Sequence, residues 1–228
     1  MIGLGEGLGE EQGPVARREF LGLLRARRLV AIIRGSDPEA SVRTAAVLVE
    51  EGIDLLEVSL SGSDAVAVIE RIRAELGPDV VLGAGTVLAA AQAEAVAAAG
   101  ASFAVTPAMS EGAARAIELG LPTLIGAWTP TEVWQAFSAG AAAVKVFPAS
   151  SGGAAHVKAL RDPFPGVPLV PVGGVGAEEA VGHLEAGAVA VGVGSPLAGD
   201  APHGGDLAAL RLRSRRFRAA VAPWTVTP

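Results

Sequence analysis

Short apolar runs recur along the chain, separated by stretches in which the apolar residues have helical spacing. The runs are rich in β-branched residues, as strands are, and cover residues 29–34, 55–60, 80–85, 103–107, 122–128, 143–148, 168–174 and 188–194. The stretches between them are rich in Ala, Glu and Arg, as in "SDAVAVIERIRAELG". This pattern predicts eight strands alternating with helices, which is typical of βαβ units on a parallel sheet.

Glycines mark the places where the intervening helices should end. One lies shortly before each of six runs, at Gly52, Gly77, Gly100, Gly120, Gly140 and Gly187. Glycine is favoured just past a helix because it adopts the left-handed conformation without steric cost. These positions therefore predict six helix ends, each followed closely by a strand.

Eight such units in one domain predict a (β/α)8 TIM barrel over residues 15–220. An entry helix is expected at Arg17–Arg28, a flexible lead-in at residues 1–14 and a tail at residues 221–228. The strands are apolar on both faces, as in sheets covered on both sides. A doubly wound open sheet is the alternative architecture.

Composition narrows the classes of function. Half of the 228 residues are hydrophobic, the formal net charge is −6, and cysteine is absent, so disulfides and thiolate metal sites are excluded. The negative charge gives no reason to expect nucleic acid or an anionic membrane as partner, and no apolar run reaches the ~18 residues of a membrane span. The basic stretch "RLRSRRFR" at 211–218 is interpreted as one face of the last helix.

Two opposite charges are expected inside the barrel. The chain has 16 arginines and only two lysines, yet Lys145 stands in the apolar run "AVKVFP". Strand side chains alternate between the interior and the helix layer, so Glu57 and Lys145 should both point inward, opposite their apolar neighbours. Arginine stays protonated, whereas a buried lysine can lose its proton and act as a nucleophile. A buried ion pair that only fixes the packing is the alternative.

Further polar groups and glycines gather at the carboxyl ends of the strands, where barrel enzymes build their active sites. Arg34, Thr86 and Pro107 follow the first, third and fourth strands. Gly173 and Gly174 follow the seventh strand, and Gly194 and Ser195 follow the eighth. Barrels often bind phosphate at the loops after strands seven and eight, so these last four residues predict a phosphate site.

The order of these motifs resembles that of a known family. The segments that carry the resemblance are "LEVSL", "GAGTV", "VTPA", "WTPTE", "VKVFPAS", "PFPGVPLVPVGGV" and "VGVGSPL". In this order they are similar to the 2-keto-3-deoxy-6-phosphogluconate (KDPG) and 4-hydroxy-2-oxoglutarate (KHG) aldolases, from about Leu29 to Leu197. The resemblance implies a class I pyruvate aldolase that needs neither metal nor organic cofactor, usually a cytoplasmic homotrimer.

The resemblance also implies roles for individual residues. Lys145 would form the Schiff base, and Glu57 would transfer protons. Arg34 and Thr86 would hold the pyruvate carboxylate, with Pro107 lining the pocket. The phosphate would bind at Gly173, Gly174, Gly194 and Ser195. The expected reaction is cleavage of KDPG to pyruvate and glyceraldehyde 3-phosphate. KHG, which gives pyruvate and glyoxylate, would be a second substrate.

Two positions depart from the commonest family pattern. Val172 stands where the usual glycine motif has threonine, and Ser61 stands where some relatives place arginine. Galactonate-type relatives accept an apolar residue at the first position, so 2-keto-3-deoxy-6-phosphogalactonate is the alternative substrate. Two other functions stay open: a phosphosugar isomerase or synthase, which needs no inward lysine, and a catalytically silent barrel that binds phosphorylated ligands.

Overall fold

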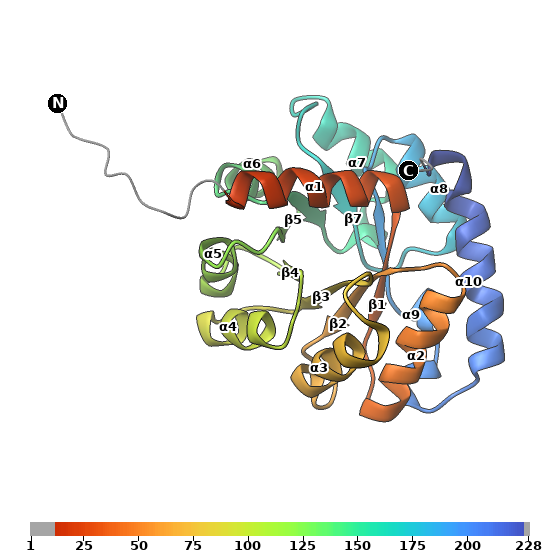
Figure 1. The fold of residues 1–228 in the computed structure, drawn as a ribbon. Coiled ribbons are helices and arrows are strands. Elements are labelled where there is room, and N and C mark those ends of the chain that lie inside the picture. Colours follow the sequence, from red (N-terminus) through yellow and green to blue (C-terminus); the bar gives the residue numbers. More distant parts are fainter. Residues whose placement is uncertain (1–11, 226–228) are drawn as a thin grey trace.

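The computed structural model describes residues 12–225, in which the strands lie inside a surrounding layer of helices (Figure 1) and form a nearly closed barrel. Eight parallel strands are ordered β7-β6-β5-β4-β3-β2-β1-β8. An isolated bridge between Val172 and Gly192 joins the two ends of this sheet. The predicted (β/α)8 barrel is therefore confirmed, and the open doubly wound alternative is wrong.

The eight strands fall within the predicted runs. They are β1 (Leu29–Ile33), β2 (Leu55–Ser59), β3 (Val81–Gly85), β4 (Phe103–Val105), β5 (Thr123–Ala127), β6 (Ala143–Val146), β7 (Leu169–Pro171) and β8 (Val191–Val193). The larger helices between and around them are α2 (Pro38–Glu50), α3 (Ala65–Leu76), α4 (Ala90–Ala98), α5 (Glu111–Glu118), α6 (Pro130–Ser138), α7 (Gly153–Arg161), α8 (Ala177–Glu185) and α10 (Leu207–Val221).

The helix ends agree with the glycine prediction. All six glycines have positive φ, between 77° and 101°, where an L side chain would be strained. Helix starts are equally local in origin. Asp37, Ser110 and Thr129 accept a hydrogen bond from a backbone N–H in the first turn of α2, α5 and α6, which supplies an acceptor to a donor that would otherwise lack one.

The entry helix α1 (Gln12–Arg27) begins before the predicted Arg17. It lies across the strands in Figure 1, and its Phe20 and Leu24 are buried against residues of the barrel interior. The Phe20 ring centroid is 4.7 Å from that of Phe103 on β4. Most of the predicted lead-in and the last three residues of the predicted tail lie outside the described residues. The described part of that tail holds the end of α10 and the 3-10 turn η3 (Ala222–Trp224).

Strand side chains divide between two apolar layers as the alternation predicts. Ala143 packs with the interior cluster, whereas Val144 and Val146 pack with the helices outside. Likewise Leu55 packs inside, and Leu56 and Val58 pack outside. Lys145 and Glu57 share the parity of the inward residues, so both functional groups point into the barrel.

The basic stretch at 211–218 makes contacts within the chain. Each of its arginines on α10 donates a hydrogen bond: Arg211 and Arg215 to the carboxylate of Glu51, Arg216 to Glu178, Arg218 to the backbone of Glu51, and Arg213 to carbonyls near β8. These bonds attach the last helix to its neighbours. Within the described residues, no helix is both long and apolar enough to cross a membrane.

Candidate active site

All nine predicted site residues line one cavity of about 350 Å³ at the carboxyl ends of the strands. They are Arg34, Glu57, Thr86, Pro107, Lys145, Gly173, Gly174, Gly194 and Ser195. They come from seven of the eight strands or the loops that follow them, and only the closure of the barrel brings them together. Their individual roles stay predictions.

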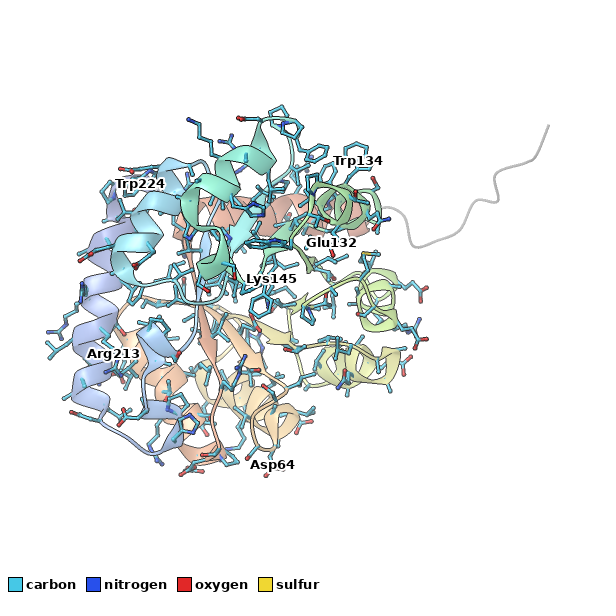
Figure 2. The ribbon with its side chains drawn as sticks, turned by 180° about the vertical axis from the view of Figure 1, so that it is seen from behind. Asp64, Glu132, Trp134, Lys145, Arg213 and Trp224 are labelled. Atoms are coloured by element: carbon cyan, nitrogen blue, oxygen red, sulfur yellow. The ribbon has the colours of Figure 1, made fainter. Side chains whose placement is uncertain are left out.

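Lys145 is almost completely buried, with 6% of its surface exposed. Strand β6 places it beside Gly126 of β5 and Val170 of β7, so its surroundings in the sheet are apolar. Its Nζ lies 5.0 Å from the ring centroid of Phe147, two residues further along the chain. Figure 2 shows Lys145 in the middle of the molecule.

Glu57 is the second buried charge of the cavity, with 4% of its surface exposed. A Cβ at Gly85 of the neighbouring strand β3 would collide with the Glu57 carboxylate. The glycine in "GAGTV" therefore leaves the room that this carboxylate occupies.

Burial raises the pKa of Glu57 above its ordinary value, and the nearby positive charges of Lys145 and Arg34 oppose this effect only in part. Desolvation disfavours the charged carboxylate more than these charges favour it. A carboxyl group of this kind takes up and returns a proton more readily near neutral pH, which suits a general acid–base.

No ion pair within 4.0 Å joins Lys145 to Glu57 in the part of the chain described. Their strands β2 and β6 are also separated by three others in the sheet. The two groups therefore leave space between them inside the barrel. A structural ion pair, the alternative considered from the sequence, would need direct contact.

Arg34 lies at the rim, directly after β1. Its Nε donates a long hydrogen bond of 3.4 Å to Ser59 Oγ, which lies 2.8 Å from Ser61 Oγ. The serine pair thus supports one edge of the guanidinium, and its other N–H groups have no acceptor among residues 12–225. A guanidinium with free N–H groups suits a carboxylate, which it can bind through two parallel hydrogen bonds.

The loops after β7 and β8 present backbone donors to the same cavity. Gly173 and Gly174 have φ of 98° and 71°, a conformation that strains any other residue. Among the described residues, no acceptor is recorded for the N–H groups of Gly173, Gly174, Gly194 or Ser195. Backbone N–H groups without a protein acceptor can bind an anion.

A short helix, α9 (Ser195–Ala198), is held from behind by the last helix. Arg213 of α10 donates to the carbonyls of Leu197 and Ala198 at 2.7 and 2.9 Å, and Figure 2 shows Arg213 on this helix. The contact fixes the loop after β8 to α10.

Sequence reasoning missed several residues that line the cavity, above all His203 and Phe147. Phe147 shares the parity of Lys145, which was a usable signal. His203 had none, because it lies in a loop and its partner Ser36 is 167 residues away. Trp128 stacks on His156, with ring centroids 4.0 Å apart, and is absent from the cavity lining.

The comparisons with known proteins indicate one family of aldolases. The family model for KDPG and KHG aldolase matches residues 22–210. The chain is 35% identical over 171 residues to the 2-dehydro-3-deoxy-6-phosphogalactonate aldolase of Escherichia coli, covering 74% of this chain and 83% of that protein. It is 36% identical over 181 residues to the 2-dehydro-3-deoxy-phosphogluconate aldolase of Pseudoalteromonas atlantica, covering 78% and 84%.

A solved structure supports the same similarity. The KDPG aldolase from Legionella pneumophila superposes with a TM-score of 0.73 at 25% identity, covering 90% of this chain and 98% of that one. In that protein, pyruvate was captured at low pH as a covalent carbinolamine intermediate.

Proposed function

The chain belongs to the KDPG and KHG aldolase family, and from that premise we propose that it cleaves 2-keto-3-deoxy-6-phosphogluconate to pyruvate and glyceraldehyde 3-phosphate through a Schiff base on Lys145. The observation that carries this proposal is the buried lysine in a cavity with a separate buried carboxyl group. A catalytically silent barrel that binds phosphorylated ligands would not need two buried ionisable groups, and a phosphosugar isomerase or synthase would not need the inward lysine.

The reaction begins at the ketone. The unprotonated Nζ of Lys145 attacks C2 of the substrate to give a carbinolamine, which loses water to form an iminium ion. Removal of the C4 hydroxyl proton then breaks the C3–C4 bond, and the bonding electrons move into the iminium. Glyceraldehyde 3-phosphate leaves, C3 of the remaining enamine takes a proton, and water releases pyruvate and the free lysine.

Glu57 would carry the protons in these steps. Carbinolamine formation, dehydration and cleavage each need a proton accepted or returned close to C2 or C4. The raised pKa of Glu57 allows one group to serve in both directions. Arg34 and Thr86 would hold the pyruvate carboxylate, with Pro107 against the substrate.

The phosphate would bind at the far end of the cavity, on the backbone N–H groups of Gly173, Gly174, Gly194 and Ser195. This assignment is supported by the positive φ of the first two residues and by the lack of a protein acceptor for all four among the described residues. KHG carries no phosphate, so it would be a second and slower substrate.

Val172 favours a second candidate substrate, 2-keto-3-deoxy-6-phosphogalactonate. It lines the cavity next to Gly173 with 6% of its surface exposed. Its side chain offers only methyl groups, whereas the threonine of the commonest family motif would offer a hydroxyl that can bind a hydroxyl of the substrate. The E. coli relative described above is named for the galactonate. Comparing kcat/KM for the two epimers would decide between them.

The central experiment is reductive trapping. Incubation with pyruvate and borohydride should add the mass of one reduced pyruvate to the peptide that contains Lys145. Lys145→Arg should abolish both trapping and cleavage while the protein stays folded. Trapping on Lys158, or activity in Lys145→Arg, would refute the mechanism.

The family resemblance supports a homotrimer as the assembly in the cytoplasm. Light scattering at micromolar concentration should give three times the chain mass, and a monomer would contradict this assignment.

A further inference from the structure

His203 lines the cavity but has no part in the reaction described above. It is the last residue of the 3-10 turn η2 (Ala201–His203), just after α9. The same cavity is lined by Ser195, Pro196 and Gly199. Because η2 follows α9 closely along the chain, His203 shares this cavity with the loop after β8 that we propose for the phosphate.

The orientation of the His203 ring is fixed by a residue of the β1–α2 loop. The backbone N–H of Ser36 lies 3.2 Å from Nδ1 of His203, and the Ser36 hydroxyl oxygen lies 2.9 Å from the same atom. A backbone N–H can only donate, so Nδ1 is the acceptor. In the neutral ring the proton is then on Nε2.

Nε2–H is thus a donor held in a known orientation, and it has no recorded acceptor among the described residues. The nearby acidic residue Asp37 accepts from the N–H of Ala40 at 2.9 Å through Oδ1, as the cap of α2, and no hydrogen bond joins it to His203 among the described residues. The donor is therefore available to a ligand in the cavity.

We propose that Nε2–H of His203 donates a hydrogen bond to the phosphoryl group of the substrate, with Ser36 as the positioning residue. This inference rests on the proposed function, because it needs a phosphorylated substrate in this cavity. It adds one side-chain donor to a subsite that we otherwise assign to backbone N–H groups. The chemical class it recognises is a phosphate monoester.

Two substitutions separate this role from a purely structural one. The terminal amide of His203→Gln reaches the position of Nε2 and can still donate, whereas that of His203→Asn reaches the position of Nδ1 and can only retain the contact with Ser36. We expect kcat/KM for the phosphorylated substrate, divided by that for KHG, to fall about tenfold in His203→Asn and His203→Ala. In His203→Gln this ratio should stay within about threefold of the wild type.

Inorganic phosphate gives a readout that needs no turnover of the phosphorylated substrate. Its inhibition constant against KHG cleavage should rise about tenfold in His203→Ala, the usual scale for losing a hydrogen bond to a charged group at an accessible site. His156→Gln is the matched control, because His156 is bound to the Trp128 carbonyl at 2.9 Å and lies outside the cavity lining. It should change neither quantity.

The outcomes distinguish the two proposals. If the wild type traps pyruvate and prefers phosphorylated substrates, but His203→Ala retains that preference, the role of His203 is refuted and the proposed function stands. If His203→Asn restores binding and His203→Gln does not, the histidine serves only the Ser36 contact, which also refutes it. Failure of the wild type to trap pyruvate would instead overturn the proposed function.

Discussion

Replacing Lys145 with methionine should cost the protein little or no stability while abolishing cleavage. Methionine keeps most of the apolar stem and removes the charge. If Lys145 serves as the nucleophile, its amino group need not stabilise the fold, whereas in a structural ion pair its charge would. The free energy of unfolding therefore discriminates between these two hypotheses.

The structure sets the size of the effect. The interaction lost is that of Nζ with the Phe147 ring at 5.0 Å, about 0.5–1 kcal/mol because the ring is 41% exposed. The cost removed is that of burying an amino group that has no hydrogen-bond partner among the described residues, which is unfavourable. Glu57 is left without its neighbour, but burial already raises its pKa, so it can take up a proton and become neutral.

Urea unfolding at one fixed protein concentration measures the difference. We expect Lys145→Met to be at most about 1 kcal/mol less stable than the wild type, and the exposed Lys158→Met on α7 serves as control, within about 0.5 kcal/mol. A structural ion pair predicts a loss of about 3–5 kcal/mol. A loss of that size in Lys145→Met, with Lys158→Met unchanged, would show that the lysine is there for packing.

Three further predictions concern other parts of the molecule. Glu57→Gln should lower kcat about 10²–10⁴-fold, measured by coupled detection of pyruvate, and near wild-type turnover would remove Glu57 from the mechanism. Gly173→Ala forces a Cβ at φ 98° to within 3.0 Å of Phe147, so KM for the phosphorylated substrate should rise more than KM for KHG; equal changes would make the loop structural. Burial lowers the pKa of His183 on α8 below its usual 6.5. As the pH falls, the unfolded chain therefore binds a proton at this residue before the folded protein does, and the free energy of unfolding should decrease below about pH 6.5. His183→Leu should make this decrease smaller in denaturant titrations between pH 7 and pH 5, and an unchanged pH dependence would contradict the prediction.

The strands and nine of the residues that line the cavity were predictable because both follow from short-range rules. Period-two alternation placed Glu57 and Lys145 on the inward face, and parallel strands bring their carboxyl ends to one mouth. Glycine conformations fixed the helix ends in the same way. Each of these inferences needs only a few neighbouring residues and the general geometry of a barrel.

What could not be predicted depends on contacts between distant loops. The bond from Ser36 to His203 forms only after the barrel closes β8 against β1. The support of α9 by Arg213 likewise depends on a contact between elements that no local pattern encodes. The reason for Gly85 is also long-range, since the carboxylate it accommodates belongs to another strand.

The bridge between Val172 and Gly192 has a consequence for the internal motion of the barrel. The ladders on the other sides of the ring each have two to five registered pairs, whereas β7 and β8 share this one bridge, with one backbone hydrogen bond beside it from Val189 to the carbonyl of Leu169. With the fewest registered pairs across it, this boundary should open at the lowest free energy, so amide hydrogen exchange should be fastest there among the strands. A phosphate held by the loops after both strands would connect the two sides, and binding would then slow exchange across β7 and β8 more than anywhere else in the ring. Substrate would in that way complete the cylinder that the chain alone leaves weakly closed.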